Sequence, residues 1–382
     1  MNDYKIMEAK TKSTICLTMI VKNESHVIAR CLKSIKPIID YWVIVDTGSK
    51  DDTVSIIQEI LKDIPGAIYK KIWVNFAHNR NQALEYAENK ADYILMLDAD
   101  EEIITKGEIN FCLTHPAYQI EIINENNKFF RLPLFKNNQG WRYKGAIHEF
   151  INIPENTPAK VLKNICIITH ADGYRSLNKN KLQHDIAMLH TALNDEPDNA
   201  HYLFYLGRYY LMVNSLEKAH KYLLQCKNTI KANKRISIGK YPIMEFEYWY
   251  AQLLLAEVKK KLSFSHHKIQ AQYLETFSDN NWHYAPLYLL AKTYIEKNFF
   301  YIAYIFLHAI IDMPPSEPIA YLHKDVFYFI RFAFIECTFN IKRYEECLRI
   351  NSQLVQDVNC PEYFKNIAIR NQDVIISAIR AR

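Results

Sequence analysis

The chain has 382 residues, 49% of them hydrophobic and 23% charged, and its formal net charge is +5. This length exceeds what a single hydrophobic core usually organises, so we expect two domains. The charge is too small for a nucleic-acid binder, which usually shows a clustered basic face. The eight glycines exclude a long glycine-rich phosphate loop.

The N-terminal segment and the cysteines bear on the cellular compartment. Residues 1–14 are polar and lack the apolar core of a secretory signal, and no stretch reaches the roughly 18 apolar residues of a membrane span. The eight cysteines are scattered without a CxxC pair, which argues against a disulfide framework and against a zinc site. We therefore expect a cytoplasmic protein with no transmembrane segment.

The first hundred residues alternate apolar runs, typical of buried strands, with segments of helical periodicity. The expected strands are 14–21, 41–46, 67–74 and 92–97, and the expected helices are 25–35, 51–64 and 76–89. This alternation predicts an α/β domain with a Rossmann-like, mostly parallel sheet covered on both faces. Ligands bind beyond the carboxyl ends of the strands in such sheets, and Asp46, Asp98 and Asp100 lie at those ends.

The stretch DYILMLDADEE, residues 92–102, places four acids within five positions at the end of an expected strand. Asp98 and Asp100 share one face of an extended chain, so their carboxylates can converge on one cation. Hard divalent ions prefer oxygen ligands, and Mg²⁺ often takes only one or two carboxylates together with substrate phosphates. The cluster therefore indicates a site for a metal ion and a diphosphate. The alternative is a solvated acidic loop.

From about residue 175 the pattern is helical only, and a repeat occurs within it. Tetratricopeptide (TPR) spacing is matched twice, at Leu203, Leu206, Gly207, Tyr210 and Ala219 and again at Leu287, Leu290, Ala291, Tyr294 and Ala303. We therefore expect two domains, 1–175 and 176–382, with the second built of TPR-like α-helical repeats. The alternative is a set of generic amphipathic helices. Stacked helix pairs create a concave surface that often holds a peptide or another helix.

Four segments, taken together, resemble the inverting GT-A glycosyltransferases of family 2. They are TMIVKNESHVIARCLKSI at 18–35, WVIVDTGSKDDT at 42–53, HNRNQAL at 78–84 and ILMLDADEE at 94–102. One branch of that family carries three later signatures, matched here by RLPLFKN at 131–137, YKGAIHE at 143–149 and ITHADGY at 168–174. That branch commonly ends in tetratricopeptide helices, so the resemblance spans nearly the whole chain.

The resemblance implies a role for each matched polar residue. Asp98 and Asp100 correspond to the DxD pair that holds Mn²⁺ or Mg²⁺ and the diphosphate of the nucleotide sugar. Asp46 corresponds to an acid near the base and ribose, and Thr47 stands where many relatives have a second acid. The alternative for Asp46 is that it caps the turn that follows it.

The resemblance places three further residues in the nucleotide pocket. Asn23 and Glu24 end the motif of the first strand, and Arg80 corresponds to a family arginine that reaches the nucleotide. The alternatives are a first-turn helix acid for Glu24 and a solvated helix residue for Arg80.

An inverting transferase needs one base, usually a carboxylate, that takes the proton from the acceptor hydroxyl. Glu149 is the first candidate, and Asp172 and Glu101 are the alternatives. A neutral imidazole completes many metal shells. His170 is therefore a candidate third metal ligand or diphosphate contact, with His148 behind it.

The leading hypothesis is a metal-dependent, inverting glycosyltransferase of the hexosyltransferase class. It would move a sugar from a nucleotide diphosphate donor, with UDP-sugars favoured, to a glycan, peptide or protein acceptor. The helical repeats would position that acceptor or join two copies into a homodimer. One alternative is a non-catalytic TPR adaptor with a degenerate GT-A domain, although an idle acidic cluster would be an electrostatic cost. Another is a nucleotidyltransferase, but such enzymes usually show a glycine-rich loop after the first strand, which this chain lacks.

Overall fold

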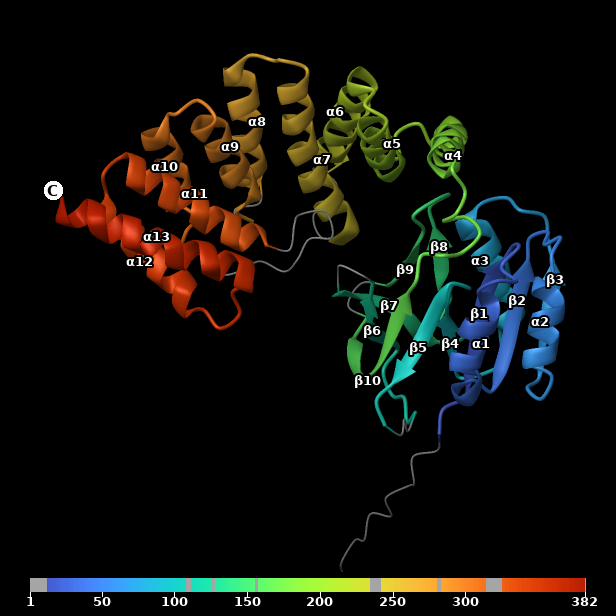
Figure 1. The fold of residues 1–382 in the computed structure, drawn as a ribbon. Helices are drawn as coiled ribbons and strands as arrows, with labels where there is room; N and C mark the ends of the chain where they lie inside the picture. The colour runs from blue at the N-terminus through green and yellow to red at the C-terminus, as the bar shows by residue number, and fades with distance from the viewer. Residues whose placement is uncertain are drawn as a thin grey trace, which may run out of the picture. The chain divides into compact units, whose positions relative to one another are not determined.

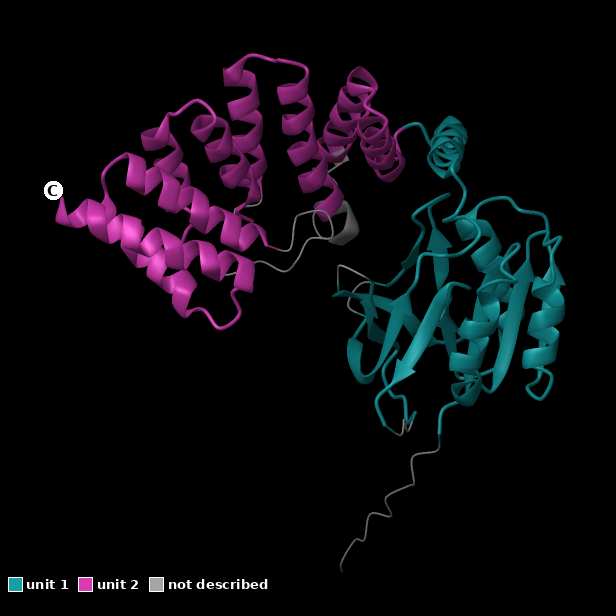
Figure 2. Cartoon of the chain, viewed as in Figure 1, with its two compact units in different colours: residues 1–197 teal, residues 198–382 magenta. Residues whose placement is uncertain are grey.

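In the computed structural model, the residues described are 12–107, 111–124, 128–154, 157–233, 242–279, 283–313 and 325–381. The chain divides into two compact units, residues 1–197 and 198–382 (Figure 2). The first unit is an α/β domain and the second is helical, which confirms the predicted fold class.

The helix α4 (Lys181–Asp195) belongs to the first unit. The expected boundary after residue 175 lies before this helix. An ion pair between Arg175 and the buried Asp185 ties α4 to the segment that leaves the sheet. The expected boundary was placed where the alternation of strands and helices gives way to helices only. That change of pattern does not reveal the contact that holds α4 in the first unit.

Within the described residues, the first unit holds an eight-stranded sheet in the order β3-β2-β1-β4-β7-β6-β10-β5 (Figure 1). Its strands are β1 (Ile15–Val21), β2 (Tyr41–Asp46), β3 (Gly66–Lys70), β4 (Tyr93–Met96), β5 (Glu101–Thr105), β6 (Ala117–Ile123), β7 (Lys128–Lys136) and β10 (Ala159–Thr169). The strands from β3 to β4 are parallel, whereas β7 runs antiparallel to both β4 and β6. A separate antiparallel pair is formed by β8 (Arg142–Lys144) and β9 (Phe150–Asn152).

Three helices cover the two faces of the parallel part of the sheet. They are α1 (Ile28–Ile35) and α2 (Thr53–Ile60) on one face and α3 (Phe76–Ala87) on the other (Figure 1). Alternate residues of β1 enter the two cores. Leu17 lies in the core that includes α1 and α2, and Cys16 lies in the core that includes α3. The apolar runs are therefore buried on both faces, as crossover helices require.

The parallel register brings several strand ends to one edge of the sheet. Val21 of β1 pairs with Asp46 of β2, and Thr18 of β1 pairs with Met96 of β4. The polar segments that follow these three strands leave the sheet together, as the sequence predicted. The strand β3 ends at Lys70, earlier than expected, because the chain leaves the sheet there to reach α3.

The second unit is helical wherever the structure describes secondary structure in it. Its helices are α5 (Ala200–Met212), α6 (Leu216–Asn233), α7 (Pro242–Lys261), α8 (His266–Asp279), α9 (Ala285–Ile295), α10 (Phe300–His308), α11 (Val326–Asn340), α12 (Tyr344–Gln356) and α13 (Glu362–Arg380). The repeat positions form its core, and Leu203 and Leu287 are buried. Gly207 packs so closely on α6 that an added Cβ would lie 2.5 Å from Leu223 Cγ.

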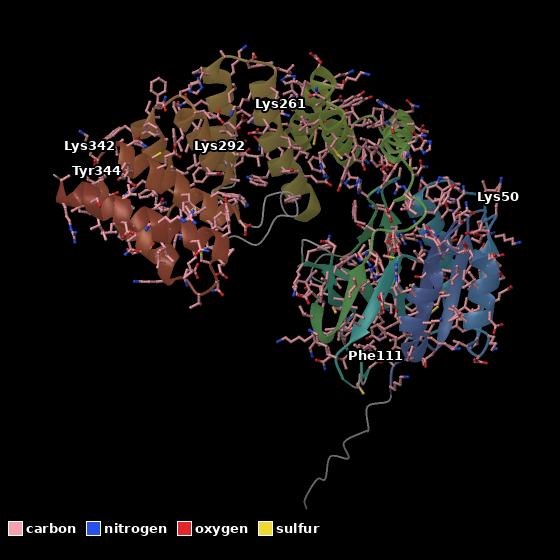
Figure 3. All side chains as sticks on the ribbon, viewed as in Figure 1. Lys50, Phe111, Lys261, Lys292, Lys342 and Tyr344 are labelled. Carbon is pink, nitrogen blue, oxygen red and sulfur yellow. The ribbon has the colours of Figure 1, made fainter. Side chains whose placement is uncertain are left out.

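No helix in the described ranges is both long and apolar enough to span a bilayer. Lysines such as Lys50 in the first unit and Lys342 in the second are exposed (Figure 3).

Candidate active site

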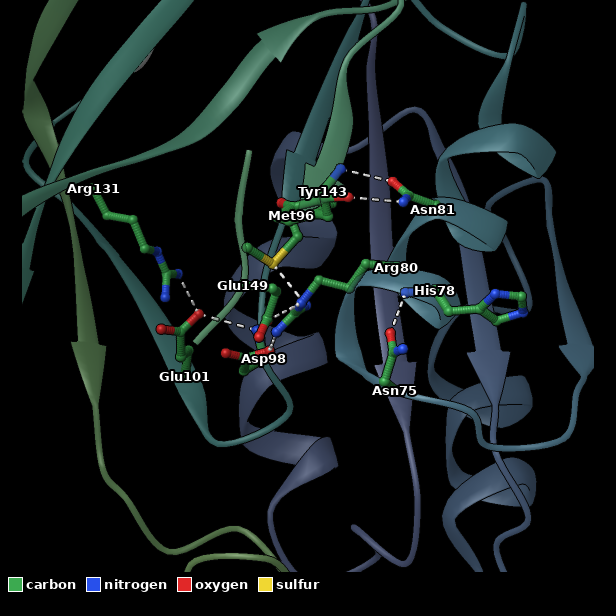
Figure 4. A network of polar contacts seen from close by, with 10 residues as sticks. All are labelled: Asn75, His78, Arg80, Asn81, Met96, Asp98, Glu101, Arg131, Tyr143 and Glu149. Carbon is green, nitrogen blue, oxygen red and sulfur yellow. Dashed lines mark hydrogen bonds and ion pairs between the residues drawn. The ribbon is translucent and has the colours of Figure 1, made fainter. Parts of the chain in front are cut away.

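A buried arginine connects two of the predicted site residues. Arg80 lies on α3, and its side chain is 7% exposed. Its Nη2 donates to Asp98 Oδ1 at 2.6 Å, and its Nε donates to Glu149 Oε1 at 2.6 Å (Figure 4). Burial by itself would raise the pKa of Asp98, but the adjacent Arg80 guanidinium lowers it below its usual value. Arg80 is therefore not a solvated helix residue.

Local contacts on α3 set the direction of Arg80. Asn75 caps the helix by accepting a hydrogen bond from the His78 amide at 2.8 Å (Figure 4). Asn81 bonds the backbone of Tyr143 in both directions, at 2.7 and 3.0 Å. These bonds fix α3 against β8, the strand that precedes Glu149, so the carboxylate is carried toward the arginine.

Glu101 supports the acidic turn from the buried side. Its side chain is 2% exposed, and its Oε2 accepts from Arg131 Nη2 at 2.7 Å and from the Asp98 amide at 3.0 Å (Figure 4). Burial raises the pKa of Glu101, which Arg131 partly offsets. Glu101 does not line the cavity around Asp98, so its position does not support the role of alternative base.

Asp100 and Glu24 face the segment that follows β10. The Tyr174 amide donates to Glu24 Oε2 at 3.0 Å, and the Gly173 amide lies 3.4 Å from Asp100 Oδ2. An added Cβ at Gly173 would lie 3.2 Å from Asp100 Oδ2 and 3.3 Å from Glu24 Oε2, so a side chain there would crowd both acids. Burial, and to a lesser extent the charge of Asp100, raises the pKa of Glu24 to about 7. The two acids are thus held together at one wall.

Asp172 and His170 have partners outside this wall. The carboxylate of Asp172 accepts two hydrogen bonds from Arg30, at 2.7 and 2.9 Å, which lower its pKa. The His170 ring lies 3.0 Å from Glu102 Oε2. Neither Asp172 nor His170 lines the cavity, although the His170 amide donates to the Asp100 carbonyl at 3.2 Å. Their roles as alternative base and metal ligand stay predictions.

The predicted residues at the ends of β1 and β2 make local hydrogen bonds. Asp46 is buried, and its Oδ1 accepts from the Ser49 amide at 3.0 Å, so it caps the turn. Asn23 adopts a left-handed backbone with φ of 57°, and its side chain accepts from the Lys50 amide at 2.8 Å. The Thr47 hydroxyl donates to the Val21 carbonyl at 3.1 Å, but Thr47 also lines a cavity.

Two cavities adjoin at this edge of the sheet within the first unit. One, of about 340 Å³, is lined by basic side chains and by acidic ones that include Asp98, Asp100 and Glu149. The other, of about 390 Å³, is lined by Thr47 and by aromatic side chains that include Trp73. Four residues line both: Ile20, Glu24, Phe76 and Arg175.

Sequence reasoning missed the cavity residues carried by the loop after β3 and by the segment 173–188. Trp73, Arg175, Lys181 and Met188 all line a cavity. Gly173 and Tyr174, the last two residues of the motif at 168–174, also line a cavity, and they were the signal that pointed to this segment.

A divalent ion fits this donor set only if it shares its ligands with a substrate. Among the described residues, no group of three or more His, Cys, Asp or Glu side chains is placed to hold a metal ion. The cavity does offer the carboxylates of Asp98 and Asp100. Two carboxylates with substrate phosphates are a usual Mg²⁺ arrangement.

Residues 16–110 match the family model described as Glycosyl transferase family 2. The chain is 29% identical over 244 residues to the SPbeta prophage-derived glycosyltransferase SunS of Bacillus subtilis, covering 59% of this chain and 56% of that protein. It is 29% identical over 231 residues to a TPR repeat-containing protein of Synechococcus elongatus, covering 55% and 56%. It is 34% identical over 113 residues to an uncharacterized glycosyltransferase of Rickettsia prowazekii, covering 28% and 37%. The chain thus spans about half the length of the first two of these relatives, and less of the third.

Part of the chain is similar to solved structures. A tetratricopeptide repeat protein from Parabacteroides merdae covers 54% of this chain and 71% of its own, with 15% identity and a TM-score of 0.37. The apo form of RapI covers 53% and 58%, with 13% identity and a TM-score of 0.40.

Proposed function

We propose that this protein is an inverting glycosyltransferase that uses a nucleoside diphosphate sugar, because residues 16–110 match the model of glycosyl transferase family 2. The observation that carries the proposal is the acid-lined cavity of about 340 Å³ at the carboxyl ends of β1 and β4. Ligands of open α/β sheets bind at such ends, and three candidate residues, Asp98, Asp100 and Glu149, line this one.

The two adjoining cavities suit the two ends of a sugar nucleotide. The cavity of about 390 Å³ offers the Trp73 ring and the Thr47 hydroxyl, which are groups that stack on a base and hydrogen-bond to it or to its ribose. The cavity around Asp98 then receives the diphosphate and the sugar. UDP-sugars are the donors that we expect, following the family resemblance.

Asp98 and Asp100 are the residues that would hold Mn²⁺ or Mg²⁺ together with the diphosphate. When bound, such an ion neutralises negative charge on the departing nucleoside diphosphate. Arg80 holds the Asp98 carboxylate in place from the buried side.

Glu149 is the base in this proposal. Its carboxylate is oriented by Arg80 and lines the same cavity as Asp98. The base takes the proton of the acceptor group as that group attacks the anomeric carbon from the side opposite the leaving diphosphate. General-base catalysis contributes about 10²–10⁴-fold. Glu149→Gln should therefore lower transfer by about that factor while UDP binding is retained.

The acceptor is a peptide, protein or glycan, and we assign its positioning to the helical unit. The two tetratricopeptide-like matches and the similarity to a TPR repeat-containing protein support this assignment. The same helices could instead join two copies of the chain into a homodimer.

The test is hydrolysis of UDP-, GDP- and dTDP-sugars in the absence of acceptor, with and without Mn²⁺, because many transferases slowly hydrolyse their donor. The proposal predicts that one nucleoside diphosphate is released, that Mn²⁺ stimulates its release, and that Asp100→Asn abolishes it. Asp52→Asn, which changes an exposed acid outside the cavities, is the matched control. If no donor is hydrolysed and none raises the thermal stability, the chain acts instead as a non-catalytic adaptor.

A further inference from the structure

The cavity around Asp98 and Asp100 requires positive charge if it receives a diphosphate. The leaving group of the proposed reaction is an anion, so groups that stabilise it must be aimed at it in advance. Four lining residues are able to carry positive charge: Arg80, His148, Arg175 and Lys181. Arg80 is already engaged, because its guanidinium bonds two carboxylates and its side chain is 7% exposed.

Arg175 lies where the two cavities meet. It lines both of them, and its guanidinium carbon lies over the Phe76 ring, 4.5 Å from the ring centroid. Its Nη2 also pairs with the buried Asp185 of α4. These two contacts orient a partly exposed guanidinium. Such a group presents several N–H donors in a plane, a geometry that matches phosphate oxygens.

Lys181 is the second cation of this segment. It is exposed and lines the acidic cavity, and its side chain has no hydrogen-bond or ion-pair partner among the described residues. It is also the first residue of α4, where the helix dipole disfavours a positive side chain. A cation at this place therefore does not stabilise the helix, and none of the described residues gives its side chain a partner in the cavity.

The order of the two cavities tells where the diphosphate should lie. The base and ribose belong beside Thr47 and Trp73, and the sugar belongs beside Glu149. The diphosphate joins these two parts, so it must cross the junction that Arg175 lines. Lys181 lines only the sugar-side cavity, which is the side on which the leaving phosphate separates from the sugar.

We propose that Arg175 and Lys181 bind the diphosphate of the donor, so that the segment leading into α4 is part of the donor site and not only a connection to the helical unit. This inference rests on the proposed function. It adds two diphosphate-binding residues from outside the segment matched by the family model, which ends at residue 110.

The test compares binding of UDP with binding of uridine to the full chain by calorimetry, in the presence of Mg²⁺. Lys181→Met and Arg175→Gln should each raise the Kd for UDP about tenfold or more, the usual effect of losing a hydrogen bond to a charged group. Both should leave the Kd for uridine within about twofold, because uridine carries no phosphate. Lys179→Met, which changes an exposed lysine that lines neither cavity, should change neither constant.

The outcomes separate this inference from the proposed function. If the wild type binds UDP and Lys181→Met binds it equally well, the inference is wrong and the proposed function stands. If the wild type binds none of UDP, GDP and dTDP, both are wrong. The Lys181 side chain has no partner among the described residues, so its replacement keeps the test valid even if Arg175→Gln disturbs the pairing with Asp185.

Discussion

Replacing Arg80 with methionine should destabilise the first unit in a pH-dependent way. The Arg80 side chain is 7% exposed, and its partners Asp98 and Glu149 are 37% and 12% exposed. Removing one member of a buried ion pair costs about 3–5 kcal/mol, because the remaining charge is left without a partner. Since Asp98 is partly exposed, we expect the lower end, about 3 kcal/mol. A unit of this size should then lose roughly 6–12 °C in Tm.

The pH dependence follows from the pKa of Asp98, which lies below its ordinary value in the fold because of Arg80. A lowered carboxylate pKa contributes stability above the ordinary pKa of about 4, and that contribution is lost as the pH falls through and below this value. In Arg80→Met, burial without the cation raises the pKa, so the charged form becomes unfavourable at neutral pH. The deficit relative to the wild type should therefore be largest at pH 7 and shrink toward pH 4.

Scanning calorimetry at pH 7 and pH 4.5 measures this deficit, and hydrogen exchange of peptides from α3 identifies the unit that is affected. Arg142→Met is the matched control, because Arg142 pairs with Glu88 at 3.6 Å with both side chains well exposed. Such pairs contribute about 0–1 kcal/mol. A loss below about 0.5 kcal/mol for Arg80→Met at pH 7, or an equal loss at both pH values, would refute the reasoning.

Three further predictions concern packing and protonation. Gly207→Ala should destabilise the second unit by about 1–3 kcal/mol in urea unfolding, because the new Cβ would meet Leu223 Cγ at 2.5 Å; an unchanged midpoint would contradict that contact. Burial lowers the pKa of His283 to about 4. Between about pH 6.5 and pH 4 the unfolded chain therefore binds a proton that the folded chain does not, and the free energy of unfolding should fall by about 3 kcal/mol over this range. His283→Asn should remove that part of the pH profile, and an identical profile would speak against it. Arg30→Met should raise the pKa of Asp172 toward its ordinary value in an NMR titration, because the hydrogen bonds from Arg30 lower it; a pKa that stays low would assign the effect to another group.

Much of the sheet and part of the site could be predicted because they follow from local pattern. The apolar runs around Leu17 and Ile94 are continuous, so they predicted strands that are buried on both faces of the sheet. The carboxyl end of the second run also predicted where Asp98 and Asp100 would lie. Arg80 and Glu149 could be selected by motif, but their contact through a buried guanidinium depends on packing between α3 and the segment near β8.

The remainder depends on contacts that no local pattern carries. Asp172 was a candidate base by its place in a motif, yet its carboxylate meets Arg30, a residue 142 positions earlier in the chain. His170 stands in the same motif, but its ring meets Glu102. Trp73 and Arg175 lie in irregular segments, where no periodicity marks a side chain that faces a cavity. Motif membership thus located the segments, and the partners determined which residues face the cavity.

The most direct measurement is Mn²⁺ binding followed by electron paramagnetic resonance, with and without UDP. The central claim is that Asp98 and Asp100 bind a divalent ion together with a nucleoside diphosphate, since no group of three His, Cys, Asp or Glu side chains among the described residues is placed to hold a metal ion. The account predicts that the signal of free Mn²⁺ decreases strongly only when UDP or another accepted nucleoside diphosphate is added, beyond the decrease that the nucleotide causes alone, and that Asp100→Asn abolishes this effect. Mn²⁺ binding that is equal with and without nucleotide, or that Asp100→Asn leaves unchanged, would contradict it.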